Sequence, residues 1–284
     1  MGRRGWPATA VIVTAALMAG GASTAGPDKP GRAHGASHPS RVVVEDITIR
    51  VPRQDPVRAY VVRPAGHLKR SSAAGVLFLH WLGEINNDRG EYLTEAITLA
   101  EQGVVSVLPQ GYFPWVPNPD GTTKDVRLVK DQVRAYRAAL NRLASDEAVD
   151  DSRIAVVGHD YGAMYGALLA DRDERVSAMV LQAPDAEMGN WFATFWLQLE
   201  GQQRADYLSL FAGLDPVDHT ARLGSRVLFQ WAGEDFFIPA EVRAAYAASS
   251  PAAQVKLYER SDHELTDAAR VDRLAFLTEQ LGLG

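Results

Sequence analysis

Short apolar runs alternate along the chain with longer segments in which apolar residues recur at a helical period. Residues 42–44 and 47–49 predict an opening strand, and residues 59–62 predict its hairpin partner, which Pro64 ends. The later runs are almost continuously apolar, as expected of strands that are buried on both faces of a sheet. These later strands are predicted over residues 75–80, 104–108, 154–157, 176–181, 227–231 and 255–258.

Helical segments are predicted between these strands. One covers residues 91–102 and is closed by Gly103, a longer one covers residues 125–145, and others are expected over residues 163–169 and 271–281. Residues 185–224 form an aromatic-rich, helix-like insertion between two strands. Strands that alternate with helices predict an α/β fold: a mostly parallel, twisted sheet with helices on both faces, here with a small helical lid.

The first residues have a different pattern. Arg3 and Arg4 precede a small-residue apolar run over residues 8–22, and Ala25 ends a stretch of small residues of the kind that signal peptidase cleaves. We therefore predict a signal peptide over residues 1–25, a disordered linker over 26–40 and one domain over 41–284. The apolar run is too short to span a bilayer permanently, so we expect a secreted or periplasmic protein without a stable membrane anchor.

Composition narrows the chemistry. The chain has 284 residues and a formal net charge of −6, which disfavours nucleic acid as a partner and leaves a small molecule as the expected one. It has no cysteine, which excludes disulfides, thiolate metal sites and a cysteine nucleophile. No motif in the sequence predicts a metal or a cofactor, and the sequence leaves the oligomeric state open.

The residues 158–162 read Gly-His-Asp-Tyr-Gly and join a predicted strand to a predicted helix. This G-x-D-x-G pattern is typical of a sharp strand–turn–helix connection that lifts its central side chain above the sheet. Asp160 is therefore the candidate nucleophile. The alternative is an ordinary aspartate that caps the helix, which is a common role at this position.

A base and an acid follow in the chain. His263 lies in a loop after the strand predicted over residues 255–258 and is the candidate general base. Asp235 follows the strand 227–231 and could orient this histidine. Asp185, which follows the strand 176–181, is the alternative acid. For either aspartate, a role limited to forming a turn stays open.

The remaining candidates surround this constellation. The backbone N–H groups of Trp81 or Leu82, after the strand 75–80, and of Tyr161 are expected to form an oxyanion hole. Aromatic side chains are expected to line the substrate pocket, or else to pack as core of the short helices. These pocket candidates are Trp81, Tyr161, Trp191, Trp196 and Tyr207.

From about residue 41 onward the sequence resembles the α/β-hydrolase superfamily. The G-E-D-x-x-I-P segment of residues 233–239 and the S-D-H of residues 261–263 are similar to dienelactone hydrolases, which carry Cys or Ser at the elbow. The elbow itself is similar to haloalkane dehalogenases and epoxide hydrolases, whose nucleophile is Asp. It departs from both, because Tyr161 stands where dehalogenases usually have Trp and the chain lacks the full cap of epoxide hydrolases. The resemblance implies an α/β-hydrolase fold with the triad Asp160, His263 and Asp235.

An aspartate nucleophile limits the reaction. A carboxylate that displaces a leaving group at saturated carbon forms an alkyl ester, which water can hydrolyse, whereas attack on an ester would expel a poor alkoxide. The leading hypothesis is therefore hydrolysis of a small apolar epoxide or haloalkane through a covalent ester on Asp160. A dienelactone-hydrolase-like enzyme that acts on esters or lactones with Asp160 as a base is the second. A non-catalytic binding protein on the same fold is the third.

Overall fold

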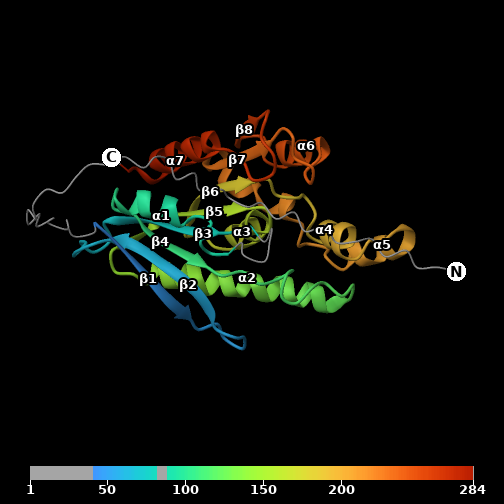
Figure 1. The fold of residues 1–284 in the computed structure, drawn as a ribbon, viewed down its shortest axis with the longest axis horizontal. Coiled ribbons are helices and arrows are strands. Elements are labelled where there is room, and N and C mark those ends of the chain that lie inside the picture. The colour runs from blue at the N-terminus through green and yellow to red at the C-terminus, as the bar shows by residue number, and fades with distance from the viewer. Residues whose placement is uncertain (1–40, 82–87, 284) are drawn as a thin grey trace, which may run out of the picture. The chain divides into compact units, whose positions relative to one another are not determined.

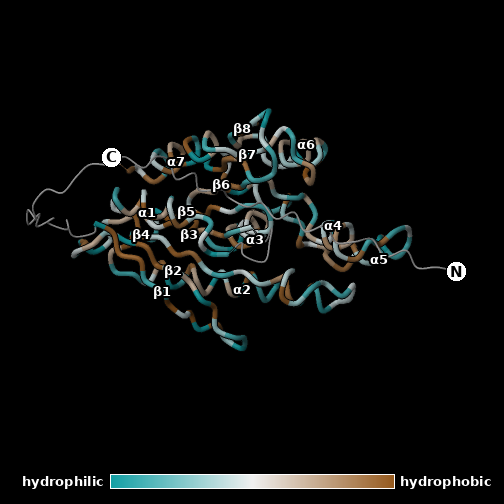
Figure 2. Tube along the Cα trace, in the orientation of Figure 1, coloured by the Kyte–Doolittle hydropathy of each residue, from teal (hydrophilic) through white to brown (hydrophobic). Residues whose placement is uncertain are grey.

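The computed structural model describes residues 41–81 and 88–283. The central element is an eight-stranded sheet with the order β1-β2-β4-β3-β5-β6-β7-β8. Hydrophobic residues follow its central strands, whereas the turn between β1 and β2 is hydrophilic (Figure 2). The strands are β1 (Val42–Ile49), β2 (Val57–Pro64), β3 (Ala73–Leu79), β4 (Val105–Pro109), β5 (Val149–His159), β6 (Val176–Gln182), β7 (Val227–Ala232) and β8 (Gln254–Tyr258).

The direction of the strands determines at which edge of the sheet the candidate site lies. β1 pairs with β2 and β2 with β4 in the antiparallel sense, whereas the six strands from β4 to β8 in the sheet order run parallel to one another. The C-terminal ends of these parallel strands therefore meet at one edge, and the loops that follow them meet there too. In open α/β sheets this edge is where ligands bind.

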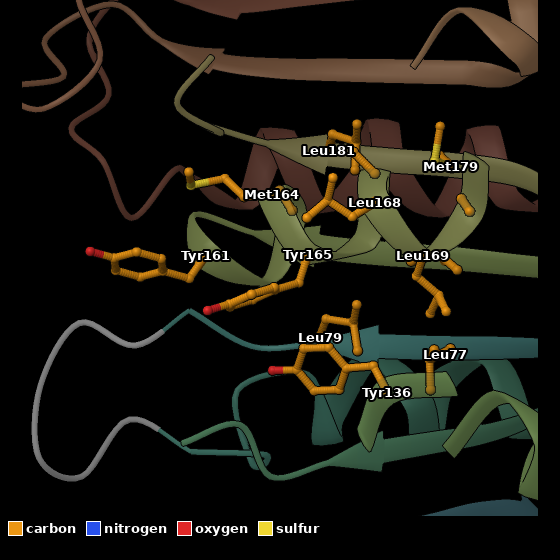
Figure 3. Packing of buried hydrophobic residues seen from close by; sticks show 14 of the residues in the cluster. Leu77, Leu79, Tyr136, Tyr161, Met164, Tyr165, Leu168, Leu169, Met179 and Leu181 are labelled. Carbon is orange, nitrogen blue, oxygen red and sulfur yellow. The ribbon is translucent and has the colours of Figure 1, made fainter. Parts of the chain in front are cut away.

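Helices cover both faces of the sheet (Figure 1). On one face α1 and α7 pack with residues such as Leu99 and Phe276, and on the other face α2 and α3 pack with residues such as Leu140 and Tyr165. Figure 3 shows α3 lying between strand residues and Tyr136 of α2. The helices are α1 (Leu93–Ala100), α2 (Thr123–Ala144), α3 (Tyr161–Asp171), α4 (Met188–Trp191), α5 (Gly201–Ser209), α6 (Ala240–Ser249) and α7 (Asp267–Leu281).

Most predicted elements are confirmed, including the hairpin, the parallel strands and the mostly parallel α/β architecture. The insertion between β6 and β7 holds α4, a π-helix over Phe192–Trp196, α5 and two 3₁₀ helices over Pro216–His219 and Ala221–Arg226. One helix was not predicted. The buried residue of α6 is Tyr246. With so little of the helix buried, its sequence lacks the regularly spaced apolar residues that predict a packed helix.

The predicted signal peptide, the predicted linker and the residue Leu82 lie outside the described residues. The domain boundary at residue 41 stays a prediction. Within the ranges 41–81 and 88–283, the helices are all too short or too polar to span a membrane.

Candidate functional site

The turn between β5 and α3 has the geometry of a strained elbow. Asp160 has φ of 52° and ψ of −119°, a region that non-glycine residues rarely occupy. The turn is held by a bond from the Asp160 N–H to the Gln182 carbonyl, at 2.8 Å, and by one from the Met164 N–H to the Asp160 carbonyl, at 3.0 Å. The strain is thus imposed by β6 on one side and by the first turn of α3 on the other.

The two glycines of the motif are required by close backbone approach. A Cβ atom at Gly158 would lie 2.4 Å from the Gly162 carbonyl oxygen, and one at Gly162 would lie 2.1 Å from the Leu79 carbonyl oxygen. A side chain at Gly158 would push α3 away from β5, and one at Gly162 would push α3 away from β3. The glycines therefore bring the helix close to the strands, while the unusual φ is carried by Asp160 itself.

The Asp160 carboxylate is buried and only partly satisfied. The residue is 2% exposed, its Oδ1 has no hydrogen-bond partner among the described residues, and its side chain makes no capping bond to α3. The alternative of an ordinary helix-capping aspartate is therefore wrong. Burial raises the pKa of this carboxyl above its ordinary value, although His263 opposes the shift.

His263 lies between two carboxylates. Its Nδ1 is 2.9 Å from Asp235 Oδ2, and its Nε2 is 4.0 Å from Asp160 Oδ2, too far for a hydrogen bond. Nε2 has no partner among the described residues. Burial alone would lower the pKa of His263, but the carboxylates of Asp160 and Asp235 outweigh it and raise this pKa to about 9.

Of the two predicted acids, the structure brings Asp235 to His263. The other oxygen of Asp235 accepts bonds from the N–H groups of Phe237 and Ile238, at 2.8 and 3.1 Å, which fixes the carboxylate. Asp185 is buried elsewhere, where it accepts from the Ala186 N–H and from Asn190 Nδ2. Its burial raises its pKa to about 6.

The predicted oxyanion hole needs a correction. The Trp81 N–H donates to Glu91 Oε2 at 2.7 Å, so this donor is already engaged by a carboxylate. Leu82, the alternative donor, lies outside the described residues. Tyr161 is the first residue of α3, where an N–H has no partner within the helix, and it remains the candidate donor.

The aromatic candidates divide into two groups. Trp81 stacks on His263 with ring centres 5.3 Å apart, and Trp191 lies 5.9 Å from His263 and 5.2 Å from Tyr161. Trp196 Nε1 donates to the Tyr161 hydroxyl at 3.2 Å. The Tyr161 hydroxyl points away from the leucine side chains beside α3 (Figure 3).

Tyr207 does not belong with this group. Its hydroxyl donates to Asp125 Oδ2 at 2.8 Å and its ring packs on Phe211, so it fastens α5 to the start of α2. The prediction that it lines the pocket is therefore corrected to a structural role.

Three site residues were not predicted. Phe237 packs its ring 5.1 Å from His263, and Glu91 and His159 form a buried contact next to the elbow. His159 was visible as the second residue of the motif, but nothing in the sequence paired it with Glu91. Phe237 follows Asp235 so closely that its place near His263 could have been inferred.

Two further features lie apart from this constellation. A cleft of about 700 Å³ opens beside the turn between β1 and β2, but none of the predicted site residues lines it. Within the described ranges, no group of His, Asp and Glu side chains is arranged to hold a metal ion.

Fold and site together define an α/β-hydrolase with an aspartate at the elbow. The family model for the α/β-hydrolase fold matches residues 81–225, and the chain belongs to this family. The match confirms the predicted superfamily and the predicted class of enzyme, a hydrolase. A search of curated proteins finds no match.

Solved structures share the fold at low identity. An acetyl xylan esterase from Paenibacillus sp. R4 is similar with a TM-score of 0.69 and 18% identity, over 86% of each chain. A putative dienelactone hydrolase from Klebsiella pneumoniae has a TM-score of 0.60 and 14% identity, over 86% of this chain and 99% of the other. A prolyl endopeptidase has a TM-score of 0.66 and 17% identity. The match covers 88% of this chain but 40% of the length of the endopeptidase.

Proposed function

We propose that the protein is an exported hydrolase that uses Asp160 as a nucleophile toward a small apolar epoxide or haloalkane. His263 acts as the base that activates water, and Asp235 orients His263. One observation carries the proposal: a carboxylate with a free oxygen stands on the strained elbow, facing a histidine whose Nε2 is also unpartnered. Buried polar atoms without partners are costly and are commonly kept for function.

In the first step an oxygen of Asp160 attacks a saturated carbon of the substrate. A carbon–oxygen bond forms, and the carbon–halogen or epoxide carbon–oxygen bond breaks, with its electron pair leaving on the halide or the alkoxide. The nucleophile carries no proton, so no base is needed here. Weak solvation of the buried carboxylate, which raises its pKa, also makes it a better nucleophile.

The Tyr161 hydroxyl is the candidate partner of the leaving group. It accepts from Trp196 Nε1, and within the described residues no acceptor lies within bonding distance of its own hydrogen. That hydrogen can therefore stabilise a departing halide or epoxide oxygen. The aromatic rings of Trp191, Phe195 and Phe237 lie around this position and favour an apolar substrate.

In the second step water attacks the carbonyl carbon of the ester. His263 Nε2 takes one proton of the water and gives it to the departing alkoxide, which leaves as the alcohol. The second proton is released to solvent as Asp160 returns to a carboxylate that keeps one oxygen from the water. Formation of the ester removes the charge of Asp160, so the pKa of His263 falls from about 9 and the neutral, basic form becomes more abundant. The first step thus prepares the base for the second.

One observation favours the alternative. The 4.0 Å between His263 Nε2 and Asp160 Oδ2 leaves both atoms able to hold a water molecule between them, and the raised pKa of Asp160 makes it a better base. Water activated in this way could attack an ester or a lactone, and two structures with the same fold are named as an acetyl xylan esterase and a dienelactone hydrolase.

A single turnover in ¹⁸O-water separates the two reactions. With excess enzyme and an epoxide or haloalkane substrate, the proposal predicts the label in the Asp160 carboxylate, because water attacks the ester carbonyl. Label found only in the product would make Asp160 a base or a bystander. Asp160→Ser should then be compared on p-nitrophenyl esters, where the proposal expects the variant to exceed the wild type.

Export is proposed from the sequence of residues 1–25, with Gly26 near the start of the mature chain. N-terminal sequencing of protein recovered from the medium or periplasm tests it. A chain that keeps Met1 and sediments with membranes would refute this part and leave the chemistry untouched.

A further inference from the structure

A carboxylate outside the triad ties together the elements of the site. Glu91 Oε1 lies 2.9 Å from His159 Nδ1, and Glu91 Oε2 accepts from the Trp81 N–H at 2.7 Å. Trp81 follows β3, and His159 ends β5 directly before Asp160. One side chain before α1 therefore connects the end of β3 with the elbow.

His159 continues this connection to the loop of the base. Its Nε2 lies 2.9 Å from the backbone carbonyl oxygen of His263. Both ring nitrogens of His159 thus face oxygen atoms within hydrogen-bond distance. The ring of His159 is therefore fixed at both nitrogens, by the Glu91 carboxylate on one side and by the His263 backbone on the other.

Contacts between the rings of Trp81, His159 and His263 also connect the end of β3, the elbow and the loop of the base. The Trp81 ring stacks on His159 at 5.0 Å and on His263 at 5.3 Å, and the His159 and His263 rings are 5.3 Å apart. The three rings contact one another, and Glu91 binds two of the three residues. The place of His263 is therefore set on two sides: its Nδ1 is fixed by Asp235 and its backbone by His159.

We infer that Glu91 and His159 are positioning residues that hold His263 at its distance from Asp160, so that its Nε2 can reach the water of the second step. The inference rests on the proposed function for its kinetic consequence, but the placement of His263 can be measured without a substrate.

Glu91 also interacts electrostatically with groups on several other elements. The titratable groups that act on Glu91, or on which Glu91 acts, are His80, His159, Asp160, Tyr92, Tyr136 and Arg273. Burial raises the pKa of Glu91, but His159 and the Trp81 N–H outweigh it and hold the pKa below its ordinary value. Glu91 is therefore held as an anionic acceptor for the Trp81 N–H and the His159 ring, and its role at the site is to fix geometry.

The test compares Glu91→Gln and His159→Gln with Glu95→Gln. Glu95 lies one turn further along the same helix region and forms a buried ion pair with Arg273, but it does not contact His263. Each protein, with ¹⁵N-labelled histidine, is titrated by NMR, and the His263 signal is assigned from its loss in His263→Gln. Formation and hydrolysis of the covalent adduct are followed separately by mass spectrometry, and folding by thermal melting.

We expect the pKa of His263 to fall in both pair variants, because its ring moves away from the carboxylates, and to stay unchanged in Glu95→Gln. Adduct hydrolysis should slow by about 10- to 100-fold, since small misplacements of a reacting group have effects of this size, whereas adduct formation should change little. Glu91→Asp keeps the charge and should recover part of the loss.

An unshifted His263 in both pair variants, or an equal shift in Glu95→Gln, would overturn the inference. If the wild type forms no adduct with any substrate, the proposed function fails, and the NMR comparison still decides the positioning role. If Glu91→Gln does not fold, His159→Gln and Glu91→Asp give the same decision.

Discussion

Two buried polar clusters in the same domain differ in how completely their polar atoms are hydrogen-bonded. The first cluster surrounds Arg273. The Arg273 guanidinium donates to Glu95, to Gln182 at 2.7 Å and to Gln230 at 2.9 Å. The amide of Gln230 in turn donates to the Tyr258 hydroxyl and to the Ala269 carbonyl. None of these side chains has an unsatisfied buried atom within the described residues.

Around Asp160 the opposite holds. Asp160 Oδ1 and His263 Nε2 are both buried and without partners, and the backbone of Asp160 is strained. A buried polar atom without a partner costs about 1–3 kcal/mol, and a strained non-glycine residue costs a similar amount. The satisfied cluster joins α1, α7 and the sheet, and the unsatisfied one leaves two polar atoms without hydrogen bonds at the proposed site. The comparison thus sets side chains that stabilise the fold beside those to which we assign the chemistry.

The largest expected effect is at the unsatisfied cluster. His263→Gln should leave adduct formation intact and slow adduct hydrolysis by about 10²–10⁴-fold, because a base is needed only in the second step. The ester should accumulate as a mass increase on the peptide that contains Asp160. An adduct that disappears at the wild-type rate would remove His263 from the mechanism.

Arg273→Met tests the satisfied cluster. It leaves the Glu95 carboxylate buried without its partner, which should lower the free energy of unfolding by about 3–5 kcal/mol. Denaturant titration measures this loss. The rate of adduct hydrolysis per folded molecule should stay at the wild-type value, and a slowed hydrolysis would show that the two clusters are coupled.

Asp235→Asn and Asp185→Asn distinguish the two predicted acids. Asparagine at 235 removes a carboxylate from the His263 imidazolium, so the pKa of His263 should fall from about 9 and adduct hydrolysis should slow by about 10²-fold. Asp185→Asn should change neither, because its carboxylate binds Ala186 and Asn190 instead. Histidine NMR and single-turnover kinetics report the result, and the reverse ranking would make Asp185 the acid.

The smallest effects are expected from a pair of tyrosines. Tyr161→Phe removes the hydroxyl offered to the leaving group and should slow adduct formation by about 10-fold, with little change in hydrolysis. Tyr207→Phe removes a bond to Asp125 and should lower the free energy of unfolding by about 1 kcal/mol without a kinetic effect. Stopped-flow assays and thermal melts separate the two, and a kinetic defect in Tyr207→Phe would restore it to the pocket.

The sequence alone predicts the fold and the order in which the proposed nucleophile, acid and base follow one another along the chain. Continuous apolar runs separated by helical periods predict a parallel sheet, because each of those signals is local and repeats along the chain. The motif at residues 158–162 also predicts the elbow from local residues, since the glycines on either side of Asp160 leave room for a tight turn.

Only the tertiary structure decided which groups meet at the sheet edge. Asp235 and Asp185 both follow parallel strands, so their sequence positions are equivalent, and the loops after β6 and β7 determined which carboxylate reaches His263. Glu91 is 68 positions from His159, and no local pattern links them. The bond from the Trp81 N–H to Glu91 was not predicted either, because no local pattern links these two residues. Hydrogen bonds between distant residues depend on how the loops pack, and that packing is a property of the whole fold rather than of any segment.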